Sequence, residues 1–95
     1  MLQIIGLEVV LMDKTKEINS IYKILVLYED LCQENSIITL EGYLTYIDRL
    51  YVEWLGKGNK EIYEILKGLW ILGKDAGHKR VKSLVFHIIS IIKKE

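Results

Sequence analysis

The chain has little of what usually builds small sites or cross-links: its 95 residues include no proline, one cysteine and two histidines. A lone cysteine, Cys32, cannot form a disulfide within the chain, so the fold must hold without covalent staples. Cys32 falls on an apolar helical stripe, and we expect a small buried hydrophobe in a reducing compartment. The histidines, His78 and His87, lie nine residues apart without a companion cysteine, so we expect no metal site and no cofactor.

Long apolar runs are also missing. The longest stretch without a charged residue, 83–92, is about half of the roughly 20 residues that a membrane-spanning helix needs, so no membrane span is expected. The first six residues lack the positive flank of a signal peptide and no small-residue cleavage site follows, which predicts a cytoplasmic protein. No phosphate-binding loop or nucleophile motif occurs, so no small-molecule substrate is identifiable and the sequence favours binding over catalysis.

What the chain does have is apolar material in excess. Hydrophobic residues make up 51% of it and the mean hydropathy is +0.19. A single domain of this size, spanning residues 1–95, has a high ratio of surface to volume and cannot easily hide so much apolar surface. We therefore expect a second chain to cover part of it, most simply a second copy in a homo-oligomer.

The charges balance overall but divide along the chain. Residues 1–56 carry nine acids and four bases, a net charge of −5, whereas residues 57–95 carry four acids and nine bases, a net charge of +5. This asymmetry is compatible with an anionic partner that binds the basic half. We favour a simpler interpretation, in which the acidic half of the same chain or of a second copy packs against the basic half.

The spacing of apolar residues predicts an all-α fold, a single compact bundle of four to five antiparallel helices. Segment 2–12 is ambiguous, because its β-branched residues and Gly6 are typical of a strand. We expect a helix there, with a strand arm in a dimer as the alternative. Asp13 is a plausible cap for a second helix over about 14–34.

The later helices are marked by caps and glycines. Thr39 can cap a helix that ends at Gly56, and Asn59 can cap the next, which ends before Gly73. A last helix is expected over about 80–93. The expected buried face of the helix after Thr39 consists of Leu40, Leu44, Ile47, Tyr51, Trp54 and Leu55.

Some side chains are displaced from these buried faces. Phe86 shares an arc of its helix with lysines, and an aromatic ring among solvent-facing residues is either ordinary surface or an interface anchor. Ile71, Ile89 and Leu27 also fall outside the expected buried stripes. These four residues are the predicted interface candidates. Asp48, at the edge of its stripe, either points to solvent or pairs with Arg80 or a tyrosine hydroxyl.

The glycine-bracketed turn 73–80 gives a first alternative function. Two helices joined by a short glycine-containing turn describe a helix-turn-helix, and the first turn of the second helix would carry His78, Lys79, Arg80 and Lys82. Cations at a helix N-terminus oppose the helix dipole, so the chain has little structural reason to place them there. The basic tip at 73–82 is therefore a candidate nucleic-acid-binding site, although the following positions are apolar and offer few groups to read bases.

Arg80 and His87 give a second alternative. Six residues separate them, and they lie about 20° from each other around a helix. This spacing resembles the arginine–histidine motif of the HEPN ribonuclease families, small all-helical proteins whose paired motifs form an RNA-cleaving site across a homodimer. The resemblance implies an arginine that stabilises the phosphate and a histidine in acid–base catalysis. It covers these two residues only, and Val81 stands where the family usually has a polar residue.

Overall fold

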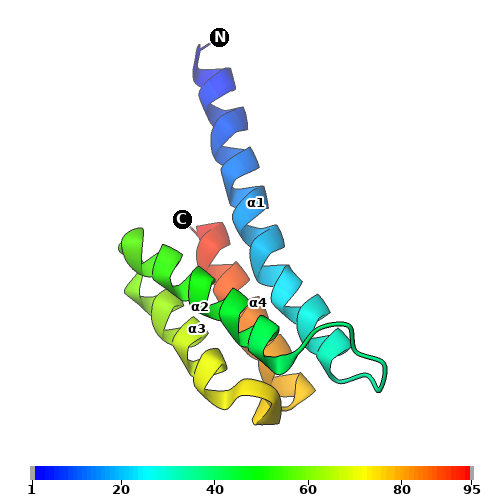
Figure 1. The fold of residues 1–95 in the computed structure, drawn as a ribbon. Coiled ribbons are helices and arrows are strands. Elements are labelled where there is room, and N and C mark those ends of the chain that lie inside the picture. Colours follow the sequence, from blue (N-terminus) through cyan, green and yellow to red (C-terminus); the bar gives the residue numbers. More distant parts are fainter. Residues whose placement is uncertain (1, 95) are drawn as a thin grey trace.

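The computed structural model describes the backbone of residues 2–94 and the side chains of residues 14–94, and all regular secondary structure in this part of the chain is helical. Four α-helices follow one another: α1 (Leu2–Leu31), α2 (Leu40–Gly56), α3 (Lys60–Leu72) and α4 (His78–Lys94). A short 3₁₀ helix, η1 (Gly73–Ala76), joins α3 to α4. The predicted all-α class is confirmed, and four helices form a compact globule (Figure 1).

Helix α1 differs from the sequence prediction because it runs unbroken through Asp13, the expected cap. No proline or glycine occurs between Gly6 and Leu31, so nothing in this stretch interrupts the helix. The alternative of a strand arm over 2–12 is wrong, because this segment is helical. The N-terminal turns of α1 reach beyond the other helices (Figure 1).

Helix α1 also ends at Leu31, earlier than expected, because the following loop folds back onto it. The Asp30 carboxylate accepts hydrogen bonds from the backbone N–H of Ile38 and the hydroxyl of Ser36, both at 3.2 Å. These two bonds provide acceptors for a hydroxyl and a backbone N–H of the loop that follows the helix. Cys32 therefore lies in this exposed turn and is itself exposed, which corrects the expectation of a buried thiol.

The predicted caps of α2 and α3 are confirmed. Thr39 Oγ1 accepts the N–H of Gly42 at 3.0 Å, and Asn59 Oδ1 accepts the N–H of Ile62 at 3.2 Å. Each bond satisfies one of the N–H groups that a helix start leaves unpaired. Helix α3 ends before Gly73, whose φ of 53° is in the region that favours glycine.

The core is built from all four helices. Helix α1 packs against α4 and α2 packs against α3, with further contacts between α1 and α2 and between α3 and α4. The buried side chains are almost all aliphatic, with three large aromatic rings among them. They are Ile21, Ile24, Tyr28, Leu31, Tyr43, Ile47, Leu50, Trp54, Ile62, Leu66, Leu69, Val81, Val85, Ile88, Ile89 and Ile92.

The buried face of α2 is rotated from the one the sequence predicted. Tyr43 and Leu50 are buried together with Ile47 and Trp54, whereas Leu55, expected inside, is 50% exposed. The rotation follows from packing against α1, since the rings of Tyr43 and Tyr28 lie 5.7 Å apart. Apolar residues therefore cover more of the circumference of α2 than its neighbours bury. The exposed and half-buried members of the predicted face are Leu40, Leu44, Tyr51 and Leu55.

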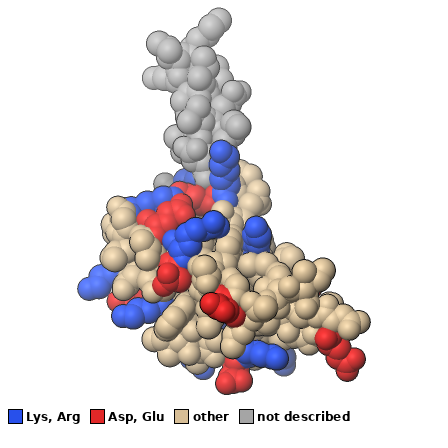
Figure 2. Space-filling model, viewed as in Figure 1, with Lys and Arg blue, Asp and Glu red and all other residues tan. Residues whose placement is uncertain are grey.

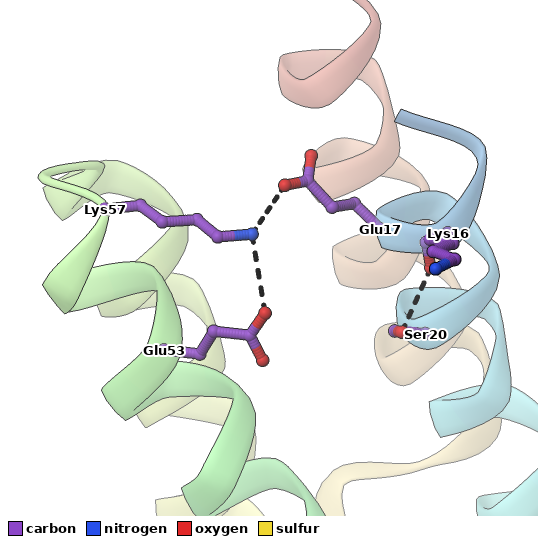
Figure 3. Close-up of polar contacts among 5 residues, drawn as sticks. All are labelled: Lys16, Glu17, Ser20, Glu53 and Lys57. Carbon is purple, nitrogen blue, oxygen red and sulfur yellow. Dashed lines mark hydrogen bonds and ion pairs between the residues drawn. The ribbon is translucent and has the colours of Figure 1, made fainter. Parts of the chain in front are cut away.

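Polar contacts fix α1 against α2. The Lys57 ammonium lies between the carboxylates of Glu17 at 2.5 Å and Glu53 at 3.4 Å (Figure 3). The hydroxyl of Tyr46 donates to the carbonyl of Ser20 at 2.7 Å. These contacts join the middle and the end of α2 to the middle of α1. No helix in the described part of the chain combines the length and the apolar character required to cross a bilayer.

Candidate interaction surface

The basic tip predicted from the sequence lies at the start of α4, with His78, Lys79, Arg80 and Lys82 all exposed. Helix α4 begins at His78, two residues earlier than expected, directly after Gly77 with its φ of 80°. Together with Gly73, this glycine brackets η1 and reverses the chain between α3 and α4. The turn is therefore short, as a helix-turn-helix requires.

One of these four side chains, His78, already has an acidic partner within the chain. His78 Nε2 lies 3.1 Å from Glu29 Oε1 on α1, and the His78 ring lies 6.1 Å from the ring of Tyr28. The Tyr28 hydroxyl donates to the carbonyl of Lys74 in η1 at 3.1 Å, so the tip is fixed against the end of α1. Within the described side chains, Lys79, Arg80 and Lys82 form no ion pair.

The Arg80 and His87 side chains are both exposed. His87 Nε2 lies 3.7 Å from Glu61 Oε1 on α3. Among the described side chains Arg80 does not pair with Asp48, and the nearby Asp48 carboxylate raises the pKa of the Tyr51 phenol. A single copy of the chain contains one such arginine–histidine pair, so a second pair could come only from another copy.

The four interface candidates divide into two groups. Phe86 is 42% exposed and Ile71 is 67% exposed, so both are available to a partner. Leu27 is only half-buried and packs against the core. The prediction of Ile89 as an interface residue is corrected, because its side chain is 3% exposed and belongs to the core. It faces inward because α1 packs against α4 along this edge, which widens the buried arc of α4.

A hollow of about 410 Å³ lies between α1 and α4, and we term it the basic groove. Its two aromatic rings, Tyr22 from α1 and Phe86 from α4, meet edge to face with centroids 5.9 Å apart. Lys93 and Lys94 supply its charge, and none of the described side chains that line it is a carboxylate. Its lining residues are Tyr22, Phe86, Ile89, Ser90, Lys93 and Lys94.

A second hollow, of about 470 Å³, lies between α2 and α3, and we term it the acidic groove. Glu41 and Asp48 supply its charge, and its lining within residues 14–94 includes no lysine or arginine. Trp70, which is 41% exposed, supplies its aromatic ring. Its lining residues are Leu40, Glu41, Leu44, Thr45, Asp48 and Trp70.

Sequence reasoning missed most of this surface. Leu40 was predicted to be buried, yet it is exposed. One signal was present: α2 has apolar residues around an arc too wide for two neighbours to cover. Figure 2 shows charges of both signs interspersed with broad uncharged areas on the viewed face of the molecule.

The described residues thus form an all-helical bundle with two apolar grooves of opposite charge. No group of three or more histidine, cysteine or acidic side chains in this part of the chain is arranged to hold a metal ion. Comparison with protein-family models, with curated proteins and with solved structures gave no match to this chain. The two grooves and the basic tip are therefore the observations from which its function must be argued.

Proposed function

We propose that the protein acts by binding and not by catalysis, and that it associates with further copies of itself. In this proposal it is a single domain of antiparallel helices that works in the cytoplasm. The observation that carries the proposal is the amount of apolar surface left uncovered by the fold. Large hydrophobic side chains exposed in the described part of the chain are Tyr22, Val26, Ile37, Leu40, Val52, Leu55, Trp70, Ile71 and Phe86.

Four of these nine residues gather in pairs. Tyr22 and Phe86 line one groove, and Leu40 and Trp70 line the other. Single exposed apolar residues are normal on a monomer, but contiguous apolar hollows with aromatic rings and a polar rim are typical of protein–protein contacts. Aromatic rings are also the residues that most often dominate binding energy at such contacts.

Sedimentation velocity across about 1 to 500 µM protein tests this function. We expect the average mass to rise above that of one 11.1 kDa chain as the concentration increases, because association follows mass action. A single species of monomer mass throughout this range would contradict the proposal.

The basic tip supports nucleic-acid binding as a second candidate function, because Lys79, Arg80 and Lys82 are exposed without ion pairs among the described side chains. Such contacts would be mainly to phosphate and would weaken steeply with salt. An electrophoretic shift of a DNA or RNA duplex at about 50 mM salt tests this candidate. No shift, or a shift retained when all three residues are changed to alanine, would exclude it.

The nuclease alternative has a separate test. RNA cleavage that is lost in His87→Ala, with helicity unchanged, would support a catalytic role for this histidine. Our proposal predicts no RNA cleavage by the wild type or by His87→Ala. Lys94→Ala is a matched control, because Lys94 is also exposed on α4 but lies outside the arginine–histidine pair.

A further inference from the structure

We infer that copies of this chain associate head to tail, with the acidic groove of one copy against the basic groove of the next. The inference rests on the proposed self-association and specifies the two surfaces that meet. Both hollows are similar in size, about 470 and 410 Å³, and each has exposed aromatic residues within it. What distinguishes them is the sign of the charge at the rim.

Charge complementarity identifies the occupant of each groove as a second copy. Two carboxylates, Glu41 and Asp48, line the acidic groove, and two ammonium groups, Lys93 and Lys94, line the basic groove. Opposite charges across an interface steer association and fix the relative orientation of the partners. The complementary partner for each groove is therefore present on the same polypeptide.

The same charges disfavour a symmetric dimer through either groove. A two-fold axis that passes through a groove sets that groove against its own copy. Lys93 and Lys94 would then face the same two lysines, and Glu41 and Asp48 would face the same two acids. Like charges set against each other disfavour association, so the contact between unlike grooves is preferred.

The two grooves are also independent of each other in the fold. The acidic groove uses α2 and α3, whereas the basic groove uses α1 and α4, and no residue lines both. One copy can therefore engage two neighbours at the same time. A contact between unlike surfaces produces a closed ring or an open chain of copies, depending on the rotation between neighbours.

Surface lysines around Phe86 extend the positive charge along α4. Lys79, Lys82 and Lys93 fall within an arc of about 60° that also contains Phe86, at about 100° per residue. All three lysines are exposed. An apolar groove bordered by such a row fits a partner that offers apolar side chains together with carboxylates, as the surface around Trp70 does.

Charge reversal on each groove tests the inference. Glu41→Lys with Asp48→Lys makes both grooves of that variant basic, and Lys93→Glu with Lys94→Glu makes both grooves of the other variant acidic. Each variant alone should lose self-association by at least about tenfold in Kd, measured by sedimentation at low salt. An equimolar mixture should recover association, because every acidic groove then meets a basic one.

The outcomes separate this inference from the proposed function. A wild-type chain that stays monomeric would overturn both. A wild-type chain that associates, with one variant unaffected, would retain self-association but overturn the head-to-tail arrangement, because one of the two grooves would then be unused. Loss in both variants without recovery in the mixture would also overturn it.

Folding of the variants must be established independently. Circular dichroism and thermal unfolding of each variant should match the wild type, since the four side chains are exposed or half-buried. If the lysine at position 41 unfolds α2, Thr45→Lys replaces it, because Thr45 is exposed and lines the same groove. The expected pattern of loss and recovery is the same for this variant.

Discussion

The ring of Phe86 on α4 stands edge-on to the ring of Tyr22 on α1, with an angle of 82° between the ring planes. Such edge-to-face pairs stabilise the contact beyond the apolar area that they bury. Both rings are nevertheless partly exposed, at 42% and 38%. The pair therefore links two helices and also presents an aromatic surface that a partner can cover.

We expect Phe86→Ala to weaken self-association by about tenfold or more in Kd, because an aromatic anchor would be lost from the interface. Stability of the isolated fold should fall by only about 1 kcal/mol, since the ring is partly exposed. Sedimentation and urea unfolding measure the two effects. Ile37→Ala serves as a control, because Ile37 is 92% exposed and lines neither groove. Equal association by both variants would show that Phe86 is ordinary surface.

The Tyr43 hydroxyl is buried and has no hydrogen-bond partner in the described part of the structure. An unpaired polar group in an apolar core is destabilising, so Tyr43→Phe should raise the free energy of unfolding by about 1 kcal/mol. Urea unfolding at neutral pH measures the change. Tyr46→Phe is the matched control and should destabilise the fold, because its hydroxyl donates to the carbonyl of Ser20. A destabilised Tyr43→Phe would mean that its hydroxyl has a partner after all.

Burial raises the pKa of Tyr43 above its ordinary value, and nearby Tyr28 and Cys32 raise it further. The folded state therefore holds this phenol protonated at pH values where the unfolded chain releases the proton. The contribution of the protonated Tyr43 phenol to stability is fully present below about pH 10, the ordinary pKa of tyrosine. It is lost progressively as the pH rises above that value.

Wild-type protein should accordingly lose stability between about pH 9 and 11 by more than Tyr43→Phe does. Urea midpoints at the two pH values measure the difference. Part of the loss will remain in the variant, because burial also raises the pKa of Tyr28 and Tyr46. Identical losses in both proteins would contradict the role assigned to Tyr43.

Thr39 is the cap of α2, and Thr39→Ala should lower the free energy of unfolding by about 1 kcal/mol. Removing its hydroxyl leaves the N–H of Gly42 without its side-chain acceptor. Thr45→Ala is the matched control, because its hydroxyl donates to the Glu41 carbonyl inside the helix. Alanine at that position should be neutral or slightly stabilising, since alanine favours helix more than threonine does. Equal effects of the two changes would argue against the cap.

Several parts of this fold were predictable from the sequence because local chemistry decides them. Thr39 and Asn59 carry side-chain oxygens that satisfy helix N–H groups three residues on, and Gly73 permits the positive φ at which α3 ends. The boundary proposed at Asp13 was wrong because a capping residue type does not break a helix when no glycine or proline accompanies it.

The rotation of α2 was not predictable in the same way. Its apolar residues cover a wide arc, and periodicity alone cannot decide which part of such an arc faces the core. The answer depends on which neighbours pack against it, here Tyr28 on one side and the α3 side chains on the other. Leu40 and Leu55 were consequently assigned to the interior although both are exposed. The acidic groove follows from the same rotation.

The exposed thiol of Cys32 has a practical consequence for any measurement of assembly. One thiol per chain can join two copies through a disulfide and can join no third, so oxidation during storage would create covalent pairs. The geometry of such pairs would be dictated by the turn after α1, and Cys32 lines neither groove. Keeping the sulfur reduced, or replacing Cys32 with serine, leaves reversible contacts as the sole source of a larger mass.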